Sequence, residues 1–169
     1  MEPLSDDTQK MDRHNAFLRR LYGSSFGVFV VAAWMHRLKR TVKIYPIDAA
    51  PFGEDPNKYV DKGDLLVTDE KGENSLLEVK HIQTSFTCQE DWPHPFVIVS
   101  NVGSVDRNRG SVKAYVILNK EATHVAIIPA SDIDSWEKRD IMSSNTQKVE
   151  AFYTCKPSSC LFKFIGDYR

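Results

Sequence analysis

Two short apolar segments separated by a polar turn constrain the fold of this chain more than any other feature. Residues 64–67 and 75–81 are of strand length, and the residues between them are polar and include Gly72. Apolar segments of this length joined by a short turn are typical of a β-hairpin. We therefore expect the two segments to pair with each other.

Further β-rich segments follow the hairpin and precede it. Each is a short apolar run bounded by polar residues, which favours strands. These segments are residues 41–47, 96–100, 114–118, 125–128, 150–155 and 161–165. We expect the last two to form a hairpin around residues 156–159.

Helical spacing of apolar residues appears before the first strand. Residues 8–22 follow this spacing until Gly23 interrupts it, and Ser24 or Ser25 could cap a second helix over residues 26–39. The second segment is apolar on most faces, so it is expected to lie against a sheet. The fold class predicted is α/β (α+β), a central mixed β-sheet with N-terminal helices packed on it.

A chain of 169 residues with 41% hydrophobic content is long enough for one compact core and short for two. We expect a single domain with an N-terminal helical extension at 1–23, a core at 24–129, and a C-terminal helix and hairpin at 130–169. The helix of this last region is expected from a pattern like a capping box at residues 131–134.

Charge and cysteine content narrow the expected environment. The net charge of -1 gives no bulk attraction to a polyanion, so any nucleic-acid surface must be local. Three cysteines are too few for a disulfide framework, and Cys155 and Cys160 lack the second pair that would complete a zinc site. No signal peptide or membrane-spanning segment is recognisable, so we expect a soluble, cytoplasmic protein without membrane contact.

Three charged residues of the first hairpin stand out. Asp64 begins its first strand, and Glu78 and Lys80 lie on alternate positions of its second strand. Because strand side chains alternate, Glu78 and Lys80 point to one face while Leu77 and Val79 point to the core. If the strands pair, Asp64 reaches the face of Glu78. In isolation such a triplet is commonly an exposed strand, but apolar neighbours on both sides favour a site.

Two carboxylates and an ammonium group at one place suit the hydrolysis of a phosphodiester. Carboxylate oxygens hold hard cations such as Mg²⁺, and the cation polarises the phosphoryl group and lowers the pKa of a bound water. A lysine can orient or deprotonate that water and offset developing negative charge.

The residues of this hairpin resemble the signature of a known nuclease family. Residues 63–67 read Gly-Asp-Leu-Leu-Val and residues 77–80 read Leu-Glu-Val-Lys. With the helix and strand that precede them, they are similar to the PD-(D/E)XK nuclease superfamily, which has a restriction-endonuclease-like core. The resemblance covers residues 24–81, about a third of the chain.

This resemblance implies a role for each residue and a function for the chain. Asp64 and Glu78 would be metal ligands together with the main-chain carbonyl of Val79, and Lys80 would be the catalytic lysine. The implied activity is that of a Mg²⁺-dependent endodeoxyribonuclease, with Mn²⁺ as a substitute ion, DNA as partner and no small-molecule cofactor. Many members are dimers that cut two strands, so the resemblance is compatible with a homodimer, and the sequence does not decide between monomer and dimer.

Weaker candidates for nucleic-acid contact lie outside the triplet. Arg107, Arg109 and Lys113 surround a predicted loop and could contact phosphates. Gln83 could contact a scissile phosphate if it shares the face of Lys80, whereas His81 is expected to be an interior or edge residue.

Two other functions remain open. Residues 24–40 contain no acid, although many family members carry a Glu on the first core helix, and His36 is the nearest polar substitute. This absence motivates a catalytically inactive nuclease-fold module that binds nucleic acid. The near-neutral charge motivates a protein-interaction or inhibitor protein without nucleic acid.

Overall fold

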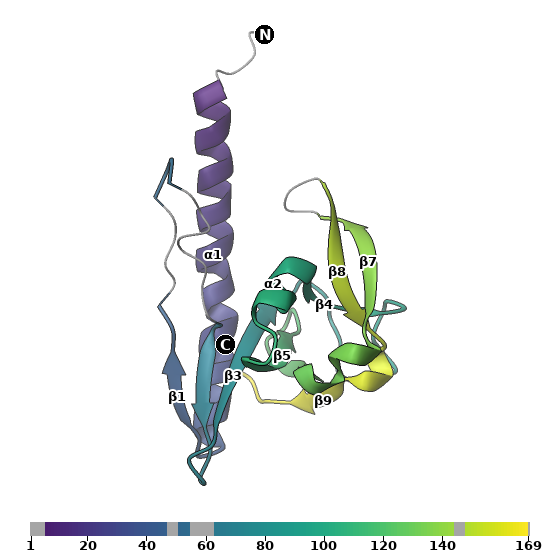
Figure 1. Cartoon of the computed structure of the whole chain (residues 1–169). Coiled ribbons are helices and arrows are strands. Elements are labelled where there is room, and N and C mark those ends of the chain that lie inside the picture. The colour runs from purple at the N-terminus through teal and green to yellow at the C-terminus, as the bar shows by residue number, and fades with distance from the viewer. Residues whose placement is uncertain (1–5, 47–50, 55–62, 144–147, 169) are drawn as a thin grey trace.

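The computed structural model describes residues 6–46, 51–54, 63–143 and 148–168, and shows a mixed α/β fold (Figure 1). Among these residues one sheet has six strands in the order β1-β2-β3-β5-β6-β9, and a second has three in the order β4-β8-β7. A long helix, α1, lies along one part of the large sheet. The predicted mixed α/β fold, with a mixed sheet and an N-terminal helix packed on it, is confirmed.

The large sheet contains the predicted first hairpin. Its strands are β1 (Thr41–Ile44), β2 (Leu65–Thr68), β3 (Asn74–His81), β5 (Val112–Leu118), β6 (His124–Pro129) and β9 (Leu161–Phe164). β2 and β3 pair antiparallel, with Leu65 opposite Leu77. β3 and β5 pair in parallel and the other neighbours are antiparallel, so the sheet is mixed.

The small sheet is antiparallel and its hairpin β7–β8 projects from the rest of the molecule (Figure 1). It is formed by β4 (Val97–Asn101), β7 (Glu137–Met142) and β8 (Val149–Cys155). The chain passes from β4 through the short helix α2 (Val102–Arg107) into β5, and the 3-10 segments η2 (Ala130–Ser135) and η3 (Pro157–Ser159) precede β7 and β9. The short helix expected from the pattern at residues 131–134 is therefore a 3-10 helix.

A single helix replaces the two that the sequence predicted at its N-terminal end. α1 runs without interruption from Asp6 to Arg37. Glycine lowers the stability of a helix by about 1 kcal/mol, which does not by itself end it. The prediction of a break at Gly23, with a new helix capped by Ser24 or Ser25, was wrong. The C-terminal part of α1 packs on the sheet, while its N-terminal half extends past it (Figure 1).

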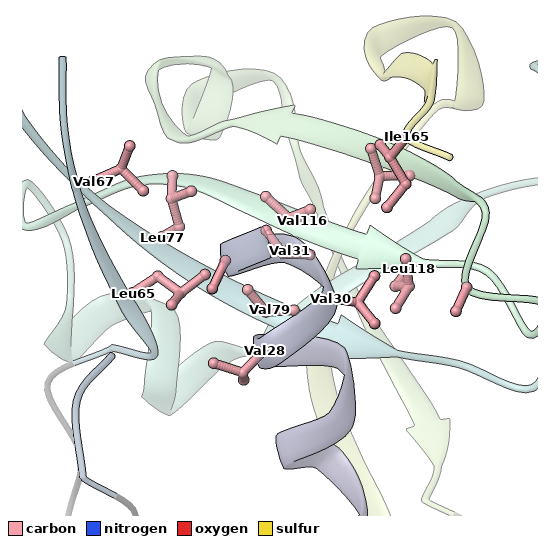
Figure 2. Packing of buried hydrophobic residues seen from close by; sticks show 13 residues of the cluster. Val28, Val30, Val31, Leu65, Val67, Leu77, Val79, Val116, Leu118 and Ile165 are labelled. Carbon is pink, nitrogen blue, oxygen red and sulfur yellow. The ribbon is translucent and has the colours of Figure 1, made fainter. Parts of the chain in front are cut away.

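The first hydrophobic core lies between α1 and one face of the large sheet (Figure 2). Val28 and Val31 of α1 meet Leu65 of β2, Val79 of β3 and Val116 of β5 there. The interface is close at Gly27, where a Cβ atom would lie 2.9 Å from the Cβ of His81. His81 therefore faces the helix, and its ring centroid is 5.6 Å from that of Phe26.

The second core lies on the opposite face of the large sheet, toward the small sheet. Tyr115 and Ile117 of β5 contribute to it, together with Val99 of β4, Trp136 and Tyr153. Because the side chains alternate along the last four residues of β5, Val116 and Leu118 belong to the first core while Tyr115 and Ile117 belong to the second.

The predicted hairpin of residues 150–155 and 161–165 is not formed. β8 pairs with β4 and β7 in the small sheet, whereas β9 pairs with β6 in the large sheet. The connection instead joins the two sheets, and it brings the Sγ atoms of Cys155 and Cys160 to 3.7 Å from each other. The two thiols are thus adjacent at a crossing between the sheets.

The three regions expected along the chain share elements in the structure. The boundary at residue 23 falls inside α1, and β9 of the region 130–169 completes the large sheet. None of the helices in the described part of the chain is long and apolar enough to span a membrane.

Candidate active site

The register of β2 and β3 brings Asp64, Glu78 and Lys80 to one face of the large sheet. Leu65 lies opposite Leu77 in this pair, and both side chains are buried in the first core. Side-chain alternation then puts the preceding Asp64 and the following Glu78 on the other face, away from α1. Lys80 follows on the same face, so the three predicted site residues come together.

Asp64 is held by the main chain on both of its sides. Its amide donates to the carbonyl of Leu77 (3.1 Å), and its carbonyl accepts from the amide of Tyr45 (3.1 Å). Its carboxylate Oδ2 accepts from the amide of Val79 at 2.7 Å. A carboxylate that accepts a main-chain N–H has a defined orientation. Asp64 is thus directed toward the strand that carries Glu78 and Lys80.

Gly63 makes this position of Asp64 possible. Its φ of +114° lies in the region that favours glycine, and an added Cβ would lie 2.8 Å from the Cγ of Leu76. Proline, which fixes φ near −65°, cannot adopt this conformation. The backbone conformation before Asp64 therefore explains why the first position of the motif is Gly63 and not proline.

Lys80 is half-buried beside the two carboxylates, and its pKa is lowered from 10.5 to about 8. Burial is the main cause, because removal from water disfavours the ammonium form, while the charges of Glu78 and Asp64 oppose the shift. Glu78 is itself half-buried, and its Oε2 atom is inaccessible to solvent. An amine with this pKa is partly neutral near pH 8 and can accept a proton.

Two residues that the sequence did not single out border the site. Tyr115 of β5 lies opposite Glu78 in the parallel pair. Its pKa is raised to about 12 by burial first and then by the charges of Glu78 and Asp106. Asp106 of α2 accepts a hydrogen bond from the hydroxyl of Tyr153 at 3.0 Å. Only the parallel pairing and the position of α2 reveal this neighbourhood, since nothing in the local sequence signals it.

The donor set of the site fits a hard cation in part. Asp64 and Glu78 supply carboxylate oxygens, which Mg²⁺ accepts from one or two side chains when a substrate supplies further oxygens. Within the described residues no group of three or more His, Cys, Asp or Glu side chains is arranged to hold a metal. A metal here would therefore need main-chain or substrate oxygens as well. The role of the Val79 carbonyl stays a prediction.

The expected cationic contacts lie near α2 and are exposed. Arg107 ends α2, and Lys113 lies on β5 beyond the turn that follows the helix. Arg109 in that turn forms an ion pair with Asp134, with an N–O distance of 2.9 Å. Arg109 and Tyr115 also line one small cavity of about 20 Å³. Arg109 is thus close to Tyr115, the residue that pairs with Glu78.

Gln83 lies away from the expected position. His81 faces α1, and the next residue, Ile82, packs in the second core and continues the face of Lys80. Gln83 follows in an exposed bend. Residues on the face of Lys80 are even-numbered, so Gln83 does not share that face, and the condition for its contact with a phosphate is not met.

Cys155 and Cys160 are buried together at the crossing between the sheets. The hydrogen bond to Cys155 and burial both raise the pKa of the Cys160 thiol, which makes it a poor nucleophile and a poor metal ligand. No second pair of ligands is found near them among the residues described.

Comparison of the chain with protein-family models, with curated proteins and with solved structures finds no match. The function of this protein is therefore inferred from the geometry and chemistry of the site.

Proposed function

We propose that this protein is a divalent-metal-dependent nuclease that hydrolyses phosphodiester bonds of DNA, most simply as an endonuclease. The observation that carries the proposal is the convergence of Asp64, Glu78 and Lys80 on one sheet face, with the pKa of Lys80 lowered to about 8. A purely solvent-exposed Glu-Val-Lys strand would not bury its lysine. Buried charges of this kind destabilise a fold, and they are typical of functional sites.

The order of elements supports a restriction-endonuclease-like core. A helix, a strand, the strand preceded by Asp64 and the strand with Glu78 and Lys80 follow one another, and β5 then pairs in parallel with β3. Members of the family usually have a helix between the strand with Glu-x-Lys and the next strand of the sheet. In this chain α2, which lies between β3 and β5 along the sequence, corresponds best to that helix. This correspondence is part of the proposal.

Each residue has a distinct task in this mechanism. Asp64 and Glu78 would hold Mg²⁺ or Mn²⁺, with the main-chain carbonyl of Val79 as a further donor. The ion would act as a Lewis acid toward the charge that develops on the phosphoryl group. Lys80 in its neutral form accepts the proton of the attacking water at Nζ and, once charged, stabilises negative charge at the phosphate.

The test compares site variants with matched variants of the turn between β2 and β3. Glu78→Gln and Lys80→Met should each lower cleavage by at least about a hundredfold, because each removes a group that stabilises the transition state. Glu70→Gln and Lys71→Met alter the same residue types at exposed turn positions and should cleave like the wild type. Plasmid, single-stranded and branched DNA would be incubated with Mg²⁺, Mn²⁺ or EDTA, and folding checked by thermal unfolding.

Two results would refute the nuclease. The wild type could leave all three kinds of DNA intact with both ions, or the two site variants could cut like the wild type. The oligomeric state in the presence of DNA, measured by sedimentation, tests the homodimer that cutting of both strands would use.

A nuclease-fold module that binds DNA without cutting it is the second candidate. It is favoured by residues 24–40 of the chain, which carry no acid that could add to Asp64 and Glu78. This function predicts salt-dependent DNA affinity, since phosphate contacts release counterions, and equal affinity for Asp64→Ala. Binding without cleavage would select it over the enzyme.

A further inference from the structure

An apolar pocket lies between the two sheets, next to the candidate active site. It has a volume of about 410 Å³, within the range of pockets that hold small organic ligands. Its lining comes from β5 of the large sheet and the residues just after β3, from β4 and β7 of the small sheet, and from the loop that leads to β4. Each sheet therefore forms one wall.

The floor of the pocket continues the sheet face that carries Lys80. Ile82 and Ile117 belong to this floor, and Ile117 lies opposite Lys80 in the pairing of β5 with β3. Ile82 is the next residue after Lys80 on the same face, so their Cα atoms are separated by two strand positions, roughly 6–7 Å. A group bound in the pocket is thus adjacent to a group bound at Lys80.

The outer wall of the pocket is aromatic. Trp92, His94 and Phe96 all line it, and the indole N–H of Trp92 donates to the carbonyl of Phe96 at 3.1 Å. The ring of Trp92 packs on that of Phe86, with centroids 5.0 Å apart. These two contacts hold the ring of Trp92 in place before a ligand binds. Flat aromatic rings held in this way are suited to stacking on another flat ring.

Polar groups occupy a small part of the lining. Thr84 and His94 contribute a hydroxyl and an imidazole among otherwise apolar side chains. The guanidinium of Arg139, which forms an ion pair with Glu137, lies 4.7 Å from the centroid of the Phe96 ring on the outside of this wall. An apolar slot with aromatic rings and a few hydrogen-bonding groups suits an unstacked base.

We propose that this pocket accepts one unstacked nucleobase of the nucleic acid whose backbone lies at Glu78 and Lys80. This inference rests on the proposed function, because it takes the sheet face at Lys80 as the position of a phosphate. The base of the neighbouring nucleotide enters between the sheets, packs against Ile82 and Ile117, and stacks on the aromatic wall. Substrates with unpaired bases are therefore preferred over uninterrupted duplex.

The test fills the pocket without removing core residues. Ile98 is 38% exposed and Ile141 is half-buried, so Ile98→Trp and Ile141→Trp place an indole in the pocket from its open side. The control, Met142→Trp, adds the same indole at the next residue of β7, which is 61% exposed and not part of the lining. Two filling variants are used so that the test can still be carried out if one of them does not fold.

Binding is measured in EDTA, which prevents metal-dependent cleavage, with short single-stranded oligonucleotides that carry one 2-aminopurine. The expected result is a change in 2-aminopurine fluorescence with the wild type and with Met142→Trp. Both filling variants should lose this change and bind about tenfold or more weakly, as expected when one base loses its stacking contact. Unchanged fluorescence and affinity in both filling variants would overturn the pocket proposal.

The two proposals can fail separately. If the wild type cuts DNA and the filling variants bind and cut as well as it does, the nuclease stands and the base pocket is refuted. If the wild type never cuts but the filling variants still lose binding of the oligonucleotide, the pocket stands and the nuclease is refuted. An absence of oligonucleotide binding by the wild type would refute the pocket.

Discussion

Asp91 organises the loop that forms the aromatic wall of the pocket. Its carboxylate accepts hydrogen bonds from the amides of Thr87 and Cys88, at 2.9 and 3.0 Å, and from the hydroxyl of Thr87 at 2.7 Å. The Cys88 amide, followed by Thr87, lowers the pKa of Asp91 from 3.8 to about 2. The charged form is therefore the one that holds this turn directly before Trp92.

Removal of this carboxylate should weaken the fold in a pH-dependent way. Because the pKa is lowered in the folded protein, the stabilisation is present above pH 3.8 and is lost as the pH falls toward 2. Asp91→Ala should thus lower the free energy of unfolding at pH 7, and its difference from the wild type should shrink between about pH 4 and pH 2. Denaturant titrations at each pH measure this difference.

The control for this prediction is Asp140→Ala, which removes an exposed carboxylate from β7. A gap between Asp91→Ala and the wild type that stays constant across the acid range would contradict the role of the charged hydrogen bonds. Asp91→Ala should also weaken oligonucleotide binding if the loop presents Trp92 to a base.

The packing of α1 on β3 depends on the absence of a side chain at one helix position. A Cβ on Gly27 would lie 2.9 Å from the Cβ of His81, which is nearer than such atoms approach. The helix and strand would have to separate, and this would disturb Val28 and Val79 in the first core as well. Glycine is therefore retained where alanine is the better helix former.

Gly27→Ala should destabilise the protein although it improves helix propensity. Overpacking costs about 1–3 kcal/mol, whereas the gain in propensity is about 1 kcal/mol, so a net loss is expected. The matched variant is Ala33→Gly, at an exposed position of the same helix, which should cost about 1 kcal/mol through propensity alone. Alanine should thus be the more stable residue at 33 and the less stable one at 27, as measured by thermal unfolding.

Element prediction succeeded where the signal was local. The first hairpin was found because its alternation and its turn lie within one short stretch of chain. β7 was missed because its residues are mostly charged and exposed, which conceals a strand that only its pairing with β8 maintains. α2 is a helix of six residues, too short for a periodic pattern, although its cap at Asn101, which accepts from the amide of Gly103 at 2.9 Å, is a recognisable signal.

The two hydrophobic cores lie on opposite faces of the same large sheet, so we expect them to unfold cooperatively. Ile117 and Leu118 are neighbours in β5, yet Ile117 is buried in the second core and Leu118 in the first. A strand that loses its contacts on one face cannot keep its position for the other. The whole described structure should therefore unfold in a single transition.

Ile117→Ala and Leu118→Ala test this prediction, each by removing a fully buried side chain from a different core. Each should lower the free energy of unfolding by about 2–5 kcal/mol. Far-UV circular dichroism and tryptophan fluorescence should report the same midpoint in each variant. An early transition that appears in only one of the two variants would show that the cores unfold independently.

The sequence by itself determined the local features on which the proposed function depends. Side-chain alternation in β3 separates Glu78 and Lys80 from Leu77 and Val79, and a short turn returns the chain so that Asp64 can join them. These features depend on residues close together along the chain. The convergence of these three residues was therefore predictable from the sequence, whereas Gln83, which follows the end of β3, does not share their face.

Only the tertiary structure decided which distant segments meet. The continuous α1, the separation of β8 from β9 and the lowered pKa of Lys80 all depend on packing between parts of the chain that no local pattern connects. The same holds for the pocket, whose walls come from both sheets. Periodicity predicts which face of a strand is buried, but the partner that buries it is chosen by the packing free energy of the whole molecule.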